Sequence, residues 1–247
     1  MEKDLTELLE AWTHDPGAVA ARRIRGADGR SRLQLRVDLG ILQMEEAGRP
    51  DGKRPYGYPT LLNYHLTMES TSRSGSLQPL TAEECASIQL EAAQFYHRYL
   101  AFSALGELTG VVEDCAHNLA LIDLVLRRSE GQPAASALTQ LYPFVRMMHA
   151  RAQAEIMLDG DRPDHAAQAV QNAMKDIRTL ARKQGLDADT GQLREIEALA
   201  SLLVNLRTRR SEEPRIRLER QLDEAVEAED FERAAQLRDE LKNARSR

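Results

Sequence analysis

The last thirty residues constrain the fold most strongly, because they carry two short apolar stripes at helical spacing. The first stripe consists of Leu218, Leu222, Ala225 and Val226, and the second of Phe231, Ala234, Ala235, Leu237 and Leu241. Such spacing places the apolar side chains on one face of each helix. Between the stripes lies Glu229-Asp230, and Asp230 is a good helix N-cap. The segment therefore predicts a tight helical hairpin.

A hairpin of this size buries too little surface to be stable alone, so its apolar edge needs something to pack on. Charged pairs one turn apart, such as Arg220 and Glu224, add only about 0.2–0.5 kcal/mol each to helix stability. Two interpretations follow from the pattern. The hairpin packs on the rest of this chain, or it docks on a partner.

The run from Glu229 to Asp239, EDFERAAQLRD, resembles the UVR motif. That motif is the hairpin found near the C-terminus of the excision-repair subunit UvrB, inside UvrC, in the stress adaptor McsA and in Clp-type unfoldases. The similarity extends from Leu218 to about Lys242. It implies docking between proteins and no reaction, with a UVR-containing or Clp/Uvr-type protein or a second copy of the chain as partner.

The apolar pattern and this resemblance together assign the partner contact to one set of side chains. The set is Leu218, Leu222, Phe231, Ala234, Ala235 and Leu237, with Arg238 and Asp239 at the rim or the hairpin corner. Other features of those families are missing, since the chain has no Walker A loop and no C-x-x-C pair. The sequence therefore predicts a stand-alone UVR protein with a different N-terminal body.

The charge distribution bears on the choice of partner. A net charge of −6 and a pI near 5.6 disfavour a general nucleic-acid binder, which usually has a basic excess. Residues 22–54 are the exception, with nine Arg and Lys against five Asp and Glu. Nucleic acid is therefore the less favoured partner, with segment 22–54 as its contact.

The sequence offers no arrangement typical of an enzyme. Cys85 and Cys115 lie in helical patterns, which favours buried thiols, and on a helix Cys115 and His117 face different directions. The six histidines lack metal-ligand spacing, so no catalytic residue, metal or cofactor is expected. The N-terminus has no apolar leader and no apolar run is long enough to cross a bilayer, so we expect a cytoplasmic protein without a membrane contact.

The N-terminal region contains the only β-strand pattern. Leu33, Leu35, Val37 and Leu39 alternate with polar residues, and residues 20–25 are a candidate hairpin partner across Gly26–Gly29. Before them, a stripe of leucines ending at Trp12 predicts a helix over residues 2–13, with Trp12 as a packing anchor.

A Gly- and Pro-rich loop follows at residues 48–59. Its cations and aromatics are Arg49, Lys53, Arg54, Tyr56 and Tyr58. Backbone amides beside such cations can hold an anion, and cations among aromatics suit single-stranded nucleic acid. The alternative is a structural loop whose Arg and Tyr side chains cover the β-ribbon.

The remainder predicts helices over 60–68, from the capping box at Thr81, after Gly106, and over 134–158, 164–183 and 190–209. Two helix pairs share small or apolar residues at 0, +4 and +7 after the turn, as Ala166, Val170 and Ala173 do. This pattern resembles tetratricopeptide (TPR) repeats, with an ordinary helical bundle as the alternative. The expected fold is mainly α, with an N-terminal β-hairpin and loop (1–79), TPR-like stacked hairpins (80–210) and the UVR hairpin (211–247).

Two functions remain. The first is a non-enzymatic adaptor that docks a partner or itself through the hairpin. The second is a nucleic-acid-binding accessory of excision-type DNA repair that uses segment 22–54.

Overall fold

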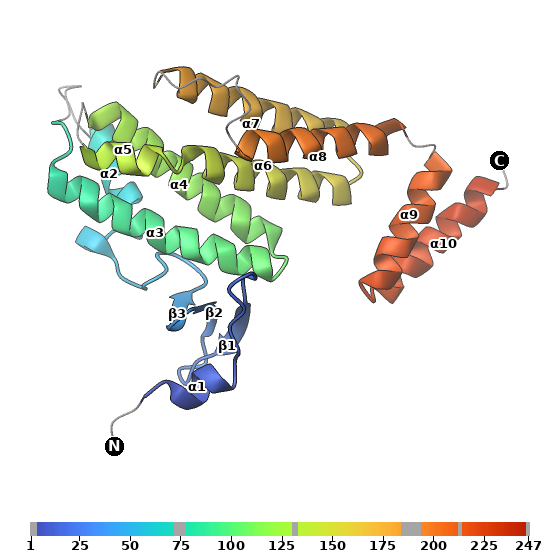
Figure 1. Cartoon of the computed structure of the whole chain (residues 1–247), viewed down its shortest axis with the longest axis horizontal. Coiled ribbons are helices and arrows are strands. Elements are labelled where there is room, and N and C mark those ends of the chain that lie inside the picture. Colours follow the sequence, from blue (N-terminus) through green and yellow to red (C-terminus); the bar gives the residue numbers. More distant parts are fainter. Residues whose placement is uncertain (1–3, 72–77, 130–132, 184–193, 212–213, 246–247) are drawn as a thin grey trace.

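The computed structural model describes residues 4–71, 78–129, 133–183, 194–211 and 214–245. A small antiparallel sheet lies against one side of a stack of long helices, and a helical hairpin at the C-terminus stands apart from that stack (Figure 1). The expected fold class is confirmed: the chain is mainly α, with strands at its N-terminal end.

The sheet is a three-stranded meander in the order β1-β2-β3. Its strands are β1 (Ala21–Arg25), β2 (Ser31–Val37) and β3 (Gly40–Glu45). The predicted pairing of β1 with β2 is present, but the prediction missed β3, where adjacent Ile41 and Leu42 blur the alternation. Leu39 was expected inside a strand; it lies in the turn between β2 and β3 and is 92% exposed.

The predicted helix over residues 2–13 is wrong in length, because α1 covers only Thr6–Glu10. Leu5 and Leu8 are exposed, so the leucine stripe does not face a core. Trp12 lies beyond the helix and is half-buried, with the Arg22 guanidinium 4.2 Å from its ring. A short helix is marginal unless an apolar face packs on the rest of the protein, and α1 has no buried residue to supply such packing.

The helices follow the predicted order with one exception. They are α2 (Leu61–Thr71), α3 (Ala82–Ala104), α4 (Leu108–Arg128), α5 (Pro133–Thr139), α6 (Tyr142–Asp159), α7 (Pro163–Lys183), α8 (Arg194–Ser211), α9 (Pro214–Glu227) and α10 (Phe231–Arg245). The capping box at Thr81 and Glu84 is present. The single helix expected over 134–158 is instead α5 and α6, because Pro143 is tolerated only in the first turn of a helix.

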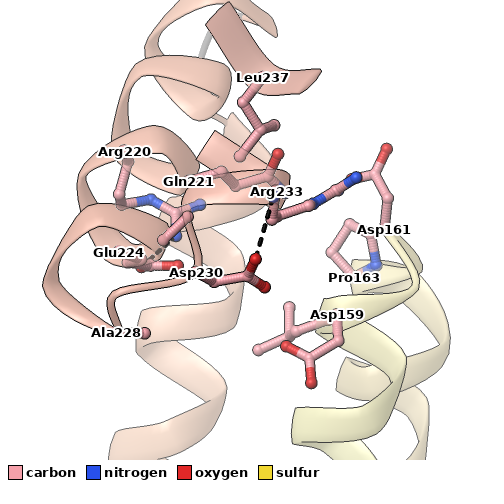
Figure 2. Close-up of a pocket in the computed structure, with 12 residues that line it drawn as sticks. Asp159, Asp161, Pro163, Arg220, Gln221, Glu224, Ala228, Asp230, Arg233 and Leu237 are labelled. Carbon is pink, nitrogen blue, oxygen red and sulfur yellow. Dashed lines mark hydrogen bonds and ion pairs between the residues drawn. The ribbon is translucent and has the colours of Figure 1, made fainter. Parts of the chain in front are cut away.

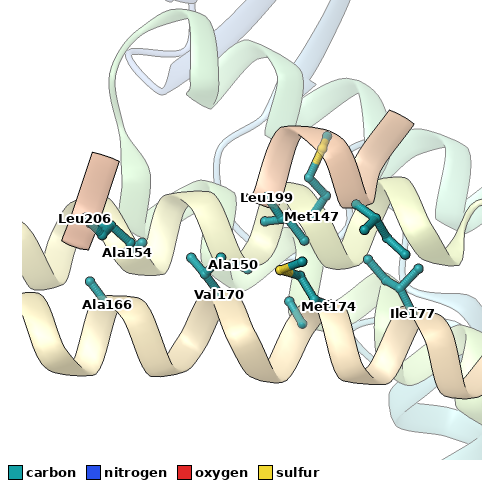
Figure 3. Packing of buried hydrophobic residues seen from close by; sticks show 11 residues of the cluster. Met147, Ala150, Ala154, Ala166, Val170, Met174, Ile177, Leu199 and Leu206 are labelled. Atoms are coloured by element: carbon teal, nitrogen blue, oxygen red, sulfur yellow. The ribbon is translucent and has the colours of Figure 1, made fainter. Parts of the chain in front are cut away.

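Helices α3, α4, α6, α7 and α8 pack in sequence order, each against the next. Small side chains such as Ala150, Ala154 and Ala166 let α6 and α7 approach closely (Figure 3). The positions predicted at 0, +4 and +7 on α7, which end at Ala173, are buried in this interface. Kinship with TPR repeats stays a prediction. Within the described residues, no helix combines the length and the apolar character that a membrane crossing requires.

The sheet and the helices share one core. Leu33 and Leu35 of β2 pack against Tyr99 and Phe102 of α3. The predicted boundary at residue 79 therefore separates segments that pack on each other. The C-terminal hairpin has its own small apolar cluster.

Three helix pairs are joined by connections of the same design. Each connection has three residues, and its middle residue has positive φ: Gly106 (73°), Asp161 (52°) and Glu229 (57°). In each, the middle amide and the next amide donate back to carbonyls of the preceding helix. This is the Schellman motif, which ends a helix through one left-handed residue. Only the first connection uses glycine, the residue that adopts this conformation without strain.

Candidate functional site: the C-terminal hairpin

The turn of the hairpin is built by Ala228, Glu229 and Asp230. The amide of Glu229 donates to the Val226 carbonyl at 3.1 Å, and the amide of Asp230 donates to the Ala225 carbonyl at 2.9 Å. The Asp230 carboxylate then accepts from the Arg233 amide at 3.0 Å. Asp230 is thus the N-cap of α10 that the sequence predicts.

The interior of the hairpin is small and closed. Ala225, Ala234 and Leu237 are buried there, with Leu237 only 1% exposed, and Leu218 and Leu222 pack against them. These side chains already contact each other, so they hold α9 on α10. Of the two adjacent alanines in the predicted apolar stripe, only Ala234 is buried against α9; Ala235 is exposed.

The outer surface of the hairpin carries the remaining predicted contact residues. Phe231, the first residue of α10, is 71% exposed, and Ala235 follows one turn later. Arg238 and Asp239 are also exposed. The structure therefore divides the predicted set into an internal group and an external group, and the external group is free to meet a partner.

The tip of the hairpin is strongly acidic. Residues 223–232 hold six carboxylates and no Lys or Arg. Those carboxylates belong to Asp223, Glu224, Glu227, Glu229, Asp230 and Glu232, and all six residues are exposed. The tip thus surrounds one exposed aromatic ring with negative charge.

Among the described residues, the hairpin and the α6–α7 corner line a common cleft (Figure 2). The cleft has a volume of about 470 Å³ and is lined by Leu158, Asp159 and Pro163 of the body, among others, and by Arg220 and Arg233 of the hairpin. Helices α9 and α10 contact each other extensively, and neither contacts another described helix to a similar extent. Phe231 is not among the residues that line the cleft.

The loop at residues 48–59 is arranged differently from the predicted anion site. Arg49 is buried and its guanidinium is ion-paired with Glu91 (3.2 Å) and Asp51 (3.0 Å). Lys53 and Arg54 are exposed, and Arg54 donates to the Gly57 carbonyl at 3.2 Å. The cations therefore do not converge, and Arg49 acts as a structural anchor.

The tyrosines of this loop gather on α2 and do not cover the β-ribbon. Tyr56 lies 4.5 Å and Tyr58 lies 5.6 Å from Tyr64, measured between ring centroids. Tyr56 has a positive φ of 51° and is largely exposed. These contacts fit the alternative of a structural loop, but the tyrosines pack on α2 and not on the β-ribbon as that alternative expected.

A buried ionic network that the sequence reading missed fixes this loop. Glu91 of α3 is fully buried and accepts from the amides of Leu61 and Leu62, at 2.8 and 3.2 Å, so it caps the N-terminus of α2. Seven residues on, Arg98 makes a bidentate pair with Asp114 and donates to the carbonyls of Glu45 and Gly48. The available signal was a pair of charged residues inside the apolar stripe of α3.

Several arginines of the β-ribbon are held by partners within the molecule. Arg23 pairs with Glu46 and Glu107, Arg32 pairs with Asp28 and Glu45, and Arg36 donates to backbone carbonyls. These arginines fasten strands to each other and to the start of α4. Arg25 of the ribbon and Lys53 and Arg54 of the loop are exposed, so only part of the +4 excess of segment 22–54 is held inside the molecule.

Cys115 and His117 are separated by their environments as well as by helix geometry. Cys115 is buried, and burial followed by the charge of Asp114 raises the pKa of its thiol far above the usual range. His117 stacks on Phe95 and its Nε2 lies 3.1 Å from a Glu91 oxygen. A neutral buried thiol is not a nucleophile. Among the described residues, no group of three His, Cys, Asp or Glu side chains is placed to bind a metal.

Comparison with known proteins singles out the same hairpin. Residues 212–247 match the model of the UvrB/uvrC motif (UVR) family. No curated protein matched the chain, and no solved structure matched its fold. The matched range contains α9, the acidic tip and α10. The C-terminal hairpin of this chain is therefore a UVR motif.

Proposed function

We propose that the chain is a non-enzymatic adaptor that docks a protein partner through the outer face of its UVR hairpin. The observation that carries this proposal is the position of Phe231. Its ring is 71% exposed although the hairpin interior is already filled by other residues. Aromatic side chains are enriched at protein–protein interfaces, and most of the Phe231 ring lies outside the filled interior of its own hairpin.

The expected contribution of this anchor is large on the scale of one side chain. Burial of a phenylalanine side chain gives about 1.5–3 kcal/mol. Since 1.4 kcal/mol corresponds to a tenfold change in affinity, removal of the ring should weaken docking by about 10- to 100-fold. The helical body α3–α8 supplies the second surface of the adaptor, which links the hairpin partner to whatever the body binds.

The test compares partner capture by the full chain and by Phe231→Ala, with captured proteins identified by mass spectrometry. Leu39→Ala is the matched control, because Leu39 is an exposed apolar residue in the β2–β3 turn, outside the hairpin. We expect a set of proteins that the wild type and Leu39→Ala retain and that Phe231→Ala loses. Identical sets from all three chains would remove the hairpin face from the mechanism.

The nucleic-acid alternative has weaker support, because Arg23, Arg32 and Arg49 of segment 22–54 are ion-paired within the molecule. It makes a separate prediction. Binding to single-stranded DNA through several phosphates would weaken by orders of magnitude between about 50 and 200 mM salt. We expect no such binding, and a steep salt-dependent affinity would favour the alternative.

A further inference from the structure

A second surface of the molecule complements the hairpin tip. It is the groove between α4, α6 and α7, with a volume of about 340 Å³. We refer to it as the α4–α7 groove. Its apolar lining comes from Leu119 and Leu126 of α4, Tyr142 of α6 and Leu180 of α7. Leu126 is 46% exposed, so an apolar wall of the groove faces solvent.

The charges at this groove favour an acidic occupant. Its two carboxylates are already paired with arginines, Asp123 with Arg127 at 2.9 Å and Asp176 with Arg146 at 3.0 Å. Lys183 also lines the groove. The last three turns of α7, residues 172–183, hold four Lys and Arg against one Asp. The groove is therefore apolar inside and basic at one edge.

The hairpin tip has the opposite character, as described above: six carboxylates around the exposed ring of Phe231. An apolar anchor ringed by negative charge matches an apolar groove with a basic edge. Complementary potentials of this kind select partners and speed their encounter.

The two surfaces lie apart within one molecule. The hairpin lies beside Pro163, the first residue of α7, whereas the groove is formed by its last turns, from Asp176 to Lys183. At 1.5 Å per residue, the 21 residues of α7 separate these ends by about 30 Å. α7 runs away from the hairpin, so the groove lies toward the far end of the stack (Figure 1).

We propose that the UVR hairpin of one copy inserts Phe231 into the α4–α7 groove of a second copy, with the acidic tip against Lys183 and the basic end of α7. This proposal rests on the proposed function and names the partner of that docking face. The contact joins two different surfaces, so it is head to tail and generates rings or open chains of copies.

The test is a charge exchange in the full-length chain, read by sedimentation velocity over a wide range of concentrations. The groove variant is Lys175→Glu with Lys183→Glu, and the tip variant is Glu227→Lys with Glu232→Lys. Lys53→Glu is the control for an exposed cation elsewhere. Because Glu232 lies in the first turn of α10, circular dichroism checks that each variant keeps its helix content.

We expect concentration-dependent self-association of the wild type and of Lys53→Glu. The groove variant and the tip variant should each associate at least about tenfold more weakly, or ~1.4 kcal/mol. An equimolar mixture of the two should associate again, because each tip then meets a groove of opposite charge. Phe231→Ala should remain monomeric.

The proposal is overturned by a monomeric wild type at every concentration, by no association in the mixture, or by equal loss in Lys53→Glu and the groove variant. None of them touches the adaptor function, which fails only if Phe231→Ala keeps every partner in the capture experiment. A groove variant that associates normally while the tip variant does not would place the docking site of the hairpin elsewhere and refute the α4–α7 groove.

Discussion

At the scale of single residues, Glu229 makes the turn of the hairpin in a strained backbone conformation. It adopts a left-handed conformation, with φ of 57°, at the position that is usually glycine in helices that end with a left-handed residue. A side chain in this conformation is strained by about 1 kcal/mol. The equivalent position between α3 and α4 is Gly106. The tip of the UVR hairpin therefore keeps a carboxylate where stability alone would favour glycine.

We predict that Glu229→Gly stabilises the hairpin by up to about 1 kcal/mol, because the left-handed strain is relieved. Hydrogen exchange of the α9 and α10 amides measures this stability directly. Glu240→Gly is the control: it places glycine inside α10 and should destabilise by about 1 kcal/mol. Slower exchange in both variants would contradict this account.

His149 gives a second prediction for single residues. Burial, together with the charge of Arg146, lowers the pKa of His149 to about 4. The unfolded chain binds a proton at this residue below about pH 6.5, whereas the folded protein does so only near pH 4. Its contribution to stability is thus full above pH 6.5 and declines as the pH falls from 6.5 to 4.

We therefore expect the free energy of unfolding to fall more between pH 7.5 and 5 in the wild type than in His149→Gln. The difference should be about 1–2 kcal/mol after allowance for solvent screening. Urea unfolding at the two pH values measures it. His165→Gln, at an exposed position on α7, should keep the wild-type dependence. Equal pH dependence in wild type and His149→Gln would contradict the assignment.

At the scale of elements, Glu91 decides how the 48–59 loop and α2 attach to α3. Its buried carboxylate accepts from two amides of α2, from Arg49 and from His117. One side chain thus caps a helix and neutralises a buried cation. The loop is fixed by tertiary ion pairs, although its own sequence resembles a flexible connector.

We predict that Glu91→Ala destabilises the protein by about 3–5 kcal/mol, because Arg49 and the first amides of α2 lose their buried partner. Asp51→Ala removes the other carboxylate on Arg49 but should cost only about 0–1 kcal/mol, since Asp51 is exposed. Chemical denaturation of both variants measures the difference. Similar losses in the two would mean that Glu91 is not the anchor.

At the scale of the whole molecule, the hairpin and the body are largely independent. Extensive contacts of α9 and α10 are with each other, and each part has its own apolar cluster. We predict that a chain ending at Ser211 unfolds at the same temperature as the body of the full chain, to within about 2 °C. Differential scanning calorimetry measures this, and a much lower transition in the shorter chain would show that the hairpin supports the body.

The sequence by itself determined the elements whose signals are local. Helical periodicity, the Thr81 capping box and the Asp230 cap predicted α3, α4, α7 and the UVR hairpin, because these patterns depend on residues one turn apart. The same reasoning found β1 and β2. It failed at α1, where an apolar stripe predicted a longer helix than forms. It also failed before Tyr142, where Pro143 lies in the first turn of a new helix inside a segment that was predicted to be one helix.

Only the tertiary structure decided which side chains of the predicted site are available. Leu237 and Phe231 are both apolar residues of one short helix, yet the first is buried inside the hairpin and the second faces solvent. Arg49 likewise reads as a loop cation but is buried against Glu91, forty-two residues away. Exposure and ion pairing depend on which residues lie next to each side chain in space, and a local sequence pattern does not identify those neighbours.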